Sequence, residues 1–417
     1  MKKILYVILD GVGDRPIAAL GGQTPLGAAR TPHLDRLARE GRLGLVQTVG
    51  PDIAPESDVA VMAMLGYDPQ TYHAGRGPLE ALGADLAFDD GDLALRGNFA
   101  TLGAGRRIVD RRVGRNLTSA EAHELAEAVT SQVRLTAAPA EFIVRASVGH
   151  RCAVVFYPKE GRLSANISNT DPAYARVGGL GVAKAVAGNE VEECRALDDS
   201  AEAWVAAELV NEFTRKSREV LDEHEVNVRR RAAGHMPANG ILVRDAGDRL
   251  PPVPPLAQRF GVRLACVVEM PVERGIALFL GMDIVEIPPG ARYRAWAAKA
   301  LEAIKAYDGL YLHLKGPDEP GHDGDCERKR ASIEQIDVEF FGPLLAAAPR
   351  DWLWAVTADH ATPCETRGHS ADPVPLLVAG SGSDGRARFT EVEAAGGTLG
   401  TLRGTAVLPL LVQLAGS

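Results

Sequence analysis

The sequence predicts an α/β protein with a mostly parallel, doubly wound sheet, interrupted by a smaller inserted α+β domain. Apolar runs near both ends of the chain alternate with helical patterns, which is typical of a parallel sheet with helices on both faces. The middle of the chain mixes short strands, turns and two long helical segments, and it ends at a proline-rich, linker-like stretch, residues 250–258. We therefore expect a core domain of residues 1–75 and 253–417 and an inserted domain of residues 76–252.

The expected elements follow in chain order. A continuous apolar run at 4–10 predicts the first core strand, because a strand covered on both faces has no polar side. Residues 31–41 carry helix signals, with Thr31 as N-cap, Pro32 at the first helical position and Gly41 as the stop. Further expected elements are strands at 264–269, 309–314, 352–358 and 374–380, a helix at 327–341, and in the middle region a helix at 201–225.

Composition and charge exclude several classes of protein. The chain has 417 residues, of which 46% are hydrophobic and 24% charged, an ordinary globular profile. A net charge of −9 without a basic run disfavours nucleic-acid binding, and no apolar run suggests a membrane span. The sequence has no P-loop pattern and no complete dinucleotide glycine motif, so we expect no nucleotide cofactor. Five scattered cysteines fit a reducing compartment, and we expect a cytoplasmic protein.

Polar residues follow the predicted strands at the points where these strands end. Because open parallel sheets bind ligands at the carboxyl ends of their strands, these residues are expected to share one edge. They are Asp10, Asp318, His322, Asp359, His360 and His369. Neutral imidazole together with carboxylate suits a divalent ion, and two ions could share this many ligands. Taken singly, each residue also has an ordinary explanation as a helix cap or a satisfied polar residue.

The stretch "HLKGPDEPGHDG" at 313–324 is the most polar of these strand ends. Asp318 and His322 are four residues apart, but Pro320 and Gly321 argue against a helix. We therefore expect a turn, held by proline and glycine, that aims the two side chains. An ordinary charged loop is the alternative.

A candidate nucleophile, Ser57, lies just before an apolar stretch with helical character in "APESDVAVMAMLGYDP". Its position is that of an N-cap. A helix N-terminus also favours a phosphoryl group, and coordination to a metal can ionise a serine hydroxyl. Both interpretations remain open from the residues alone. The arginines of "DRRVGR", which are Arg111, Arg112 and Arg115, could bind phosphate or carboxylate, or could simply be solvated.

Six segments occur in order along the chain: "LDGVGDRPIAALGGQTPLGAARTPHLDRLAREG", "SDVAVMAMLGYDP", "GRGPLEALG", "GNFAT", "KGPDEPGHDG" and "TADH…GHSADPVP". Together they resemble the archaeal-type cofactor-independent, or 2,3-bisphosphoglycerate-independent, phosphoglycerate mutases. That family belongs to the alkaline phosphatase superfamily of metalloenzymes. The resemblance spans both the core and the insert, and it implies an alkaline-phosphatase-like core.

The resemblance implies a role for each site residue. Ser57 would be the nucleophile and would be phosphorylated during turnover. The ligands implied for one ion are Asp10, Ser57, Asp359 and His360, and those for the other are Asp318, His322 and His369. The ions would be Mn, Mg or Zn, and no 2,3-bisphosphoglycerate would be needed. The residues expected to contact the substrate are Arg111, Arg112, Arg115, Arg244 and Lys315. The sequence departs from the family pattern at Glu56, where the family usually carries glycine.

The implied reaction is the interconversion of 3-phosphoglycerate and 2-phosphoglycerate, a step of glycolysis and gluconeogenesis. The expected partner is a small phosphorylated acid, with no nucleic acid and no membrane. One alternative is a metal-dependent phosphatase or phosphotransferase of the same superfamily, including the branch proposed as homoserine kinases. The other is a non-catalytic binding protein on the same scaffold. Accumulation of inorganic phosphate would distinguish a hydrolase from a mutase.

Overall fold

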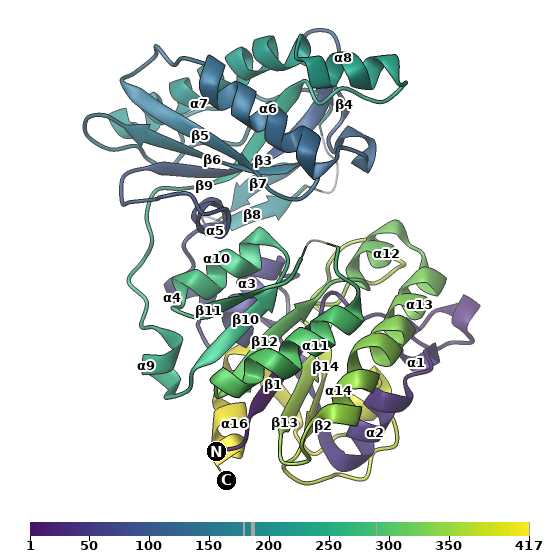
Figure 1. The fold of residues 1–417 in the computed structure, drawn as a ribbon. Coiled ribbons are helices and arrows are strands. Elements are labelled where there is room, and N and C mark those ends of the chain that lie inside the picture. Colours follow the sequence, from purple (N-terminus) through teal and green to yellow (C-terminus); the bar gives the residue numbers. More distant parts are fainter. Residues whose placement is uncertain (178–179, 185–187, 289, 417) are drawn as a thin grey trace. The chain divides into compact units, whose positions relative to one another are not determined.

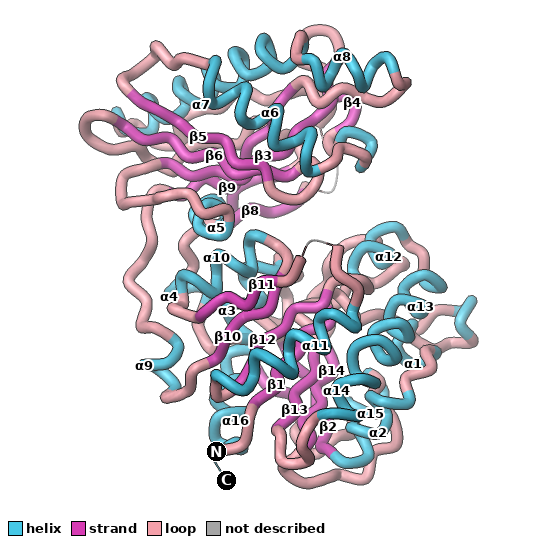
Figure 2. The backbone as a smooth tube through the Cα atoms, viewed as in Figure 1, coloured by secondary structure: helices cyan, strands magenta, loops and turns pink. Residues whose placement is uncertain are grey.

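The computed structural model describes residues 1–177, 180–184, 188–288 and 290–416, and Figures 1 and 2 show their fold. The chain forms two compact units. Unit 1 contains Met1–His73, Val253–Glu269 and Ile276–Ser417, and unit 2 contains Ala74–Pro252 and Met270–Gly275. None of the described helices is long and apolar enough to cross a membrane.

One short segment, Met270–Gly275, is grouped with unit 2, whereas the sequence placed it in the core domain. The cause is a close contact between α10 (Pro271–Phe279) and α5 (Arg76–Gly83). A Cβ atom on Gly83 would lie 1.8 Å from the carbonyl oxygen of Pro271, and one on Gly275 would lie 1.8 Å from that of Leu79. The two backbones therefore touch. The role of unit 2 as an inserted, substrate-covering domain stays a prediction.

Unit 1 is built on an eight-stranded sheet. In spatial order its strands are β11 (Asp283–Glu286), β10 (Leu264–Val268), β12 (Gly309–Leu314), β1 (Ile4–Leu9), β13 (Leu353–Thr357), β14 (Val374–Ala379), β2 (Gly41–Gln47) and β15 (Thr401–Arg403). β14 runs antiparallel to both of its neighbours, and the other described pairs of this sheet are parallel. The α/β class with a large, mostly parallel sheet is confirmed. The apolar sequence of β14 did not indicate that this strand runs antiparallel to its neighbours.

β1 and β12 lie in the middle of this sheet, where both faces need cover. All residues of the two strands are buried, as their nearly continuous apolar sequences require. Three helices pack together across the face of the sheet seen in Figure 1: α11 (Tyr293–Ala303), α13 (Cys326–Ile336) and α14 (Gly342–Ala347). α16 (Gly404–Gly416) packs on α3 (Ser57–Met64) and against β1 and β13.

The register of the central strands aligns their carboxyl ends. Leu9 of β1 is paired with Leu314 of β12, and Ile8 of β1 is paired with Thr357 of β13. The segments that follow these three strands therefore leave the sheet at the same edge. These segments carry most of the predicted metal ligands, so the fold brings residues from distant parts of the sequence together.

The N-terminus of α2 (Pro32–Glu40) is capped differently from the prediction, although the helix has the predicted bounds. Thr31 stands at the N-cap position, but its side chain accepts no hydrogen bond from the helix. The carboxylate of Asp337 accepts hydrogen bonds from the backbone N–H groups of His33 at 3.2 Å and Leu34 at 2.8 Å. A buried carboxylate from a distant segment is the stronger acceptor and takes the role predicted for Thr31.

Unit 2 is built on a five-stranded antiparallel sheet. Its strands are β3 (Leu93–Leu102), β4 (Ile108–Asp110), β5 (Ala140–Ala146), β6 (Arg151–Pro158) and β9 (Gly240–Gly247). α6 (Ser119–Gln132) and α7 (Ala201–Asp222) cover one face and α5 covers the other, as Figures 1 and 2 show. Leu93 and Leu95 accordingly pack with α6 and α7, while Ala94 packs with α5. β7 (Tyr174–Val177) and β8 (Leu180–Ala183) form a separate pair.

The helix expected at 201–225 ends earlier than predicted. α7 ends at Asp222, and a new helix, α8 (Glu225–Ala232), begins after His224. Nδ1 of His224 accepts a hydrogen bond from the backbone N–H of Val226 at 3.2 Å. A histidine is an uncommon N-cap, so the polar run at this junction gave no clear stop signal.

Candidate functional site

The segments at the ends of β1, β12 and β13 meet in close contact, and Gly11 shows how close. Gly11 follows Asp10 and has a φ of 61°, and a Cβ atom there would lie 2.7 Å from both Asp318 Oδ1 and Thr362 Oγ1. Its backbone N–H donates to Asp359 Oδ1 at 3.2 Å. Both the conformation and the lack of space require glycine at this position.

Asp318 and His322 lie on a short helix, α12 (Asp318–Asp323). The expectation of a non-helical turn is wrong. Pro320 is the third helical residue, a position at which a backbone N–H would have no acceptor within the helix, so proline is tolerated there. Gly324 follows the helix with a φ of 76°. One helical turn places Nε2 of His322 3.5 Å from Asp318 Oδ2.

Ser57 is the first residue of α3, and the N-cap position belongs to Glu56. The interpretation of Ser57 as the N-cap is therefore wrong. The Oγ atom of Ser57 lies 3.2 Å from Nε2 of His360. The segment before the serine is held by His369, whose Nδ1 donates to the carbonyl oxygen of Pro55 at 2.8 Å. The hydroxyl is thus directed at the strand-end residues.

The inner cluster of metal-ligand side chains consists of Asp10, His313 and Asp359, all buried. Nε2 of His313 lies 3.7 Å from Asp10 Oδ1 and 3.6 Å from Asp359 Oδ2. These separations are too long for hydrogen bonds. Among the described residues, Oδ1 of Asp10 and Oδ2 of Asp359 are buried and have no hydrogen-bond partner. Buried oxygens without donors fit a bound cation. His313 was not among the predicted ligands.

The outer cluster consists of Asp318, His360 and His369. Nε2 of His369 lies 3.7 Å from Asp318 Oδ1, and its ring stacks on that of His360 with 3.7 Å between ring centres. His360 also faces the inner cluster, since its Nε2 lies 3.2 Å from Asp359 Oδ2 and 3.6 Å from Asp10 Oδ1. The structure therefore brings all seven predicted ligands to one edge, with His360 between the clusters. Their roles stay predictions.

Hydrogen bonds fix which ring nitrogen of three histidines faces the clusters. Nδ1 of His322 and of His369 each lies next to a backbone carbonyl oxygen, at 3.1 and 2.8 Å. Nδ1 of His360 lies 3.1 Å from Thr362 Oγ1, and that hydroxyl donates its proton to Asp318. In each case Nδ1 must be the donor, so Nε2 keeps a lone pair directed at the carboxylates. Metal-binding imidazoles are oriented in this way.

Burial and neighbouring charges set the protonation of these ligands. Burial lowers the pKa of His360 and the pKa of His369, which favours the neutral imidazole that binds metal. Burial, together with the charge of Asp10, raises the pKa of Asp359 to about 7. Burial also opposes ionisation of Asp10, but the Lys315 ammonium and His313 outweigh it and hold the pKa of Asp10 well below its usual range. The nearby positive charge keeps Asp10 ionised but does not suffice for Asp359 as well. A bound cation would supply the additional positive charge.

Two charged residues, Lys315 and Glu56, lie beside the clusters. Nζ of Lys315 lies 2.9 Å from Asp10 Oδ2, so this lysine is paired with an inner carboxylate, and its contact with a substrate stays a prediction. Glu56, the departure from the family pattern, is half-buried next to Ser57. Its negative charge opposes the burial that lowers the pKa of His369.

The four arginines predicted to contact the substrate lie in unit 2 and are of two kinds. Arg244 is buried, with Nη1 3.0 Å from Asp171 Oδ2. Arg111 also pairs with Asp171. Arg112 is exposed, and so is Arg115. Two of the predicted arginines thus pair with an internal carboxylate, and the substrate contacts of all four stay predictions.

Further basic residues that the sequence analysis missed lie in the same part of unit 2. Burial, together with the charges of Arg244 and Arg76, lowers the pKa of Arg96 to about 9. Burial, together with the charge of Arg151, lowers the pKa of His150 to about 3. The arginine charges that contribute to both shifts produce a positive potential, which favours an anion. Two of the family-like segments could have pointed to these arginines, because Arg76 lies in "GRGPLEALG" and Arg96 directly precedes "GNFAT".

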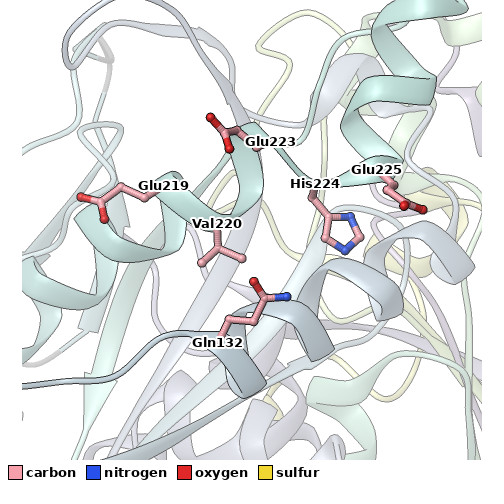
Figure 3. Close-up of a pocket in the computed structure, with 6 residues that line it drawn as sticks. All are labelled: Gln132, Glu219, Val220, Glu223, His224 and Glu225. Atoms are coloured by element: carbon pink, nitrogen blue, oxygen red, sulfur yellow. The ribbon is translucent and has the colours of Figure 1, made fainter.

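A surface pocket of about 570 Å³ lies elsewhere in unit 2, where α6 meets the junction of α7 and α8 (Figure 3). It is lined by Gln132, Glu219, Val220, Glu223, His224 and Glu225. Figure 3 shows the carboxylates of Glu219 and Glu225 pointing away from one another, so the acidic groups do not converge on one point. No predicted site residue lines this pocket.

Carboxylates and neutral imidazoles at the carboxyl ends of a parallel sheet, with a serine hydroxyl facing them, fit the class of metal-dependent phosphoryl-transfer proteins. Comparison with known proteins gives the family. A family model described as "2,3-bisphosphoglycerate-independent phosphoglycerate mutase" matches residues 38–227. A protein of that name from Aeropyrum pernix is 46% identical over 413 residues, which cover 96% of each chain. The chain belongs to the 2,3-bisphosphoglycerate-independent phosphoglycerate mutase family, which confirms the resemblance.

Two solved structures are similar over the full chain. One is a protein from Pyrococcus horikoshii, with 32% identity, a TM-score of 0.80 and coverage of 100% of this chain and 97% of that chain. The other is the cofactor-independent phosphoglycerate mutase from Thermoplasma acidophilum, with 34% identity, a TM-score of 0.65 and coverage of 100% of both chains. The similarity therefore extends over the residues of both units.

Proposed function

We propose that the protein is a 2,3-bisphosphoglycerate-independent phosphoglycerate mutase, an isomerase that interconverts 3-phosphoglycerate and 2-phosphoglycerate in glycolysis and gluconeogenesis. The names of its relatives support this substrate and this reaction. The observation that carries the proposal is the position of Ser57 Oγ, 3.2 Å from His360 Nε2, at the edge where the metal-ligand residues gather. Because the serine itself accepts the phosphoryl group, neither 2,3-bisphosphoglycerate nor a nucleotide is required.

Two divalent ions, Mn, Mg or Zn, would complete the site. The proposed ligands are Asp10, Ser57, Asp359 and His360 for one ion, and Asp318, His322 and His369 for the other. The buried carboxylate oxygens without donors and the neutral imidazoles support this assignment. When bound, the ions supply positive charge that favours ionisation of the serine hydroxyl and stabilises the attacking and leaving oxygens.

Ser57 carries out both half-reactions. Its Oγ attacks the phosphorus of 3-phosphoglycerate, a bond from Oγ to phosphorus forms, and the bond to the C3 oxygen breaks as that oxygen takes a proton. The C2 hydroxyl of the same glycerate then attacks the phosphoserine, which gives 2-phosphoglycerate and returns the serine hydroxyl. Because α3 begins at Ser57, the N–H groups of its first turn and the helix dipole favour the negative phosphoryl group.

We propose that unit 2 is an inserted domain that covers the bound substrate. Its predicted contacts are Arg111, Arg112, Arg115 and Arg244. The arginine charges that, after burial, lower the pKa of Arg96 and the pKa of His150 support an anion-binding role. Exclusion of water matters here, because water would hydrolyse an exposed phosphoserine and turn the mutase into a phosphatase. The five scattered cysteines support a cytoplasmic location.

A double-label experiment tests the reaction. The metal-loaded protein is given a mixture of unlabelled 3-phosphoglycerate and 3-phosphoglycerate that carries both a heavy-carbon backbone and heavy-oxygen phosphate, without 2,3-bisphosphoglycerate. The products are weighed by mass spectrometry. We expect 2-phosphoglycerate in which the two labels remain together, because the glycerate stays bound between the half-reactions.

Two other outcomes would contradict the proposal in different ways. Scrambled labels in 2-phosphoglycerate would mean that glycerate leaves while the phosphoryl group is on the serine. Free heavy phosphate as the main product would make the protein a phosphatase. The matched control is Ser57→Ala, which should give neither product if the serine is the nucleophile.

A further inference from the structure

His313 is a buried histidine near the end of β12, 1% exposed and placed between two carboxylates. It is not among the ligands that the resemblance implies. We propose that His313 binds, through Nε2, the divalent ion that Asp10 and Asp359 hold. This inference rests on the proposed metal-dependent function and adds a ligand to its inner ion.

The spacing of the ligand atoms supports this assignment. The four separations between Nε2 of His313 or His360 and the facing oxygens of Asp10 and Asp359 are 3.7, 3.6, 3.6 and 3.2 Å. A tetrahedral ion with bonds of about 2.0–2.2 Å places its ligand atoms about 3.3–3.6 Å apart. The two histidines and two aspartates therefore have the spacing of one coordination shell.

An ion pair between protonated His313 and the two carboxylates is the competing explanation. Charge-assisted hydrogen bonds join nitrogen and oxygen at about 2.7–2.9 Å, whereas Nε2 of His313 lies 3.6 Å from Asp359 and 3.7 Å from Asp10. Nζ of Lys315 also lies 3.5 Å from this Nε2 atom, so the lysine would have to give way when an ion binds. Asp10 already has a cation at hydrogen-bond distance, because Nζ of Lys315 lies 2.9 Å from its Oδ2. The oxygens left without a donor are Oδ1 of Asp10 and Oδ2 of Asp359, which are the atoms that face His313.

Tyr311 supplies the outer partner that a metal-binding imidazole needs. Its hydroxyl lies 3.2 Å from Nδ1 of His313, and the two rings meet edge to face. With Nε2 bound to an ion, Nδ1 carries the proton and donates it to the tyrosine oxygen. Tyr311 is itself buried within β12, so this hydrogen bond holds the imidazole in one orientation.

The added nitrogen ligand changes the expected metal preference. Without His313 the inner ion would have one imidazole among oxygen ligands, a set that suits Mg or Mn. With His313 it has two imidazoles, two carboxylates and the Ser57 oxygen, a set that suits Zn or Co better, because Mg prefers oxygen and retains its water. The inner ion is therefore expected to resemble the outer ion in its metal preference, because the proposed ligands of the outer ion also include two imidazoles.

Cobalt reports directly on bound histidines, independently of catalysis. The full-length protein is stripped of metal and titrated with Co²⁺, and binding is followed by equilibrium dialysis and by proton NMR of the exchangeable imidazole N–H groups. An imidazole bound to Co²⁺ through Nε2 gives an Nδ1–H signal far outside the usual range. We expect two bound ions and one such signal from each of His313, His322, His360 and His369.

The variant His313→Gln should lose one signal and bind one of the two ions at least about tenfold more weakly, since even outer partners of metal ligands change affinity by this much. His123→Gln, which removes an exposed histidine of unit 2, is the matched control and should change neither quantity. Unchanged affinity and an unchanged set of signals in His313→Gln would overturn the inference. If that variant does not fold, the wild-type spectrum decides, because only three shifted signals would exclude His313. Failure of the wild type to bind Co²⁺ would instead contradict the proposed function as a whole.

Discussion

Replacement of Lys329 by methionine tests how the candidate site is held together. Lys329 lies on α13 and is fully buried. Its Nζ donates to the carbonyl oxygens of Gly13 at 3.0 Å and Thr362 at 2.9 Å, and to Asp14 Oδ2 at 2.8 Å. Gly13 and Asp14 lie on the segment after β1, and Thr362 lies on the segment after β13. One ammonium group therefore joins two segments that carry predicted metal ligands.

The expected loss of stability follows from these contacts. Methionine keeps the apolar stem of the side chain and removes the charge, so the variant isolates the ammonium group. Removal of one partner of a buried ion pair costs about 3–5 kcal/mol. Asp14 also accepts hydrogen bonds from the backbone N–H groups of Arg15 at 2.8 Å and Cys364 at 3.2 Å. These remaining donors offset part of the loss, so we expect Lys329→Met to lower the free energy of unfolding by about 3 kcal/mol.

Arg328→Met provides a matched control on the same helix. Arg328 is exposed and pairs with Asp323 at 2.9 Å and Glu319 at 3.3 Å, and exposed pairs contribute less than about 1 kcal/mol. Urea unfolding of the metal-free proteins, followed by tryptophan fluorescence, measures both variants. Equal stability of the two would refute the reasoning. Lys329→Met should also bind Co²⁺ more weakly, because the two ligand-bearing segments lose their common donor.

Three further predictions concern the serine, the arginines and a buried carboxylate. Ser57→Ala should abolish turnover and change the free energy of unfolding by less than about 1 kcal/mol, because the serine does not cap α3; a variant with a tenth of the wild-type rate would make water the attacking group. Arg112→Ala or Arg115→Ala should raise KM and increase phosphate release relative to isomerisation, and unchanged kinetics in both would show that these arginines are merely solvated. Burial raises the pKa of Glu391 from 4.5 to about 7, so the folded state holds a proton that the unfolded state has lost, and stability should fall as pH rises from 4.5 to 7. Glu391→Gln should remove this fall in a pH series of urea unfolding, and an identical slope in the variant would exclude Glu391 as its cause.

The strands of unit 1 could be predicted because each is an apolar run that ends at a polar residue. β1, β10, β12, β13 and β14 all lie within the expected ranges. The meeting of Asp10, Asp318 and Asp359 followed from the same prediction, since parallel strands end at a common edge. The antiparallel direction of β14 could not be predicted, because an apolar run has the same pattern in both directions and its partner is chosen by long-range packing.

His313 was missed because it lies inside the apolar run "GLYLHL", and the prediction used only residues beyond the strand ends. Its role depends on the pairing of His313 with Ile8 in the register of β12 and β1, which sets it beside Asp10, and no local pattern encodes that register. Arg244 shows the same limit in unit 2. The resemblance implied a contact with the substrate and gave no sign that the fold buries Arg244 against Asp171, which lies far away in the sequence.

Thr362 connects the two clusters through a single hydroxyl group. Its Oγ1 donates to Asp318 Oδ1 at 2.7 Å and lies 3.1 Å from Nδ1 of His360, and the residue is fully buried. A hydroxyl has one proton to donate, so while it donates to Asp318 it can only accept from the imidazole. His360 must then carry its proton on Nδ1, which leaves the Nε2 lone pair to accept from the Ser57 hydroxyl or to bind the inner ion. Within the proposed two-ion site, a cation that keeps Asp318 ionised therefore also keeps His360 in the form that the inner ion needs.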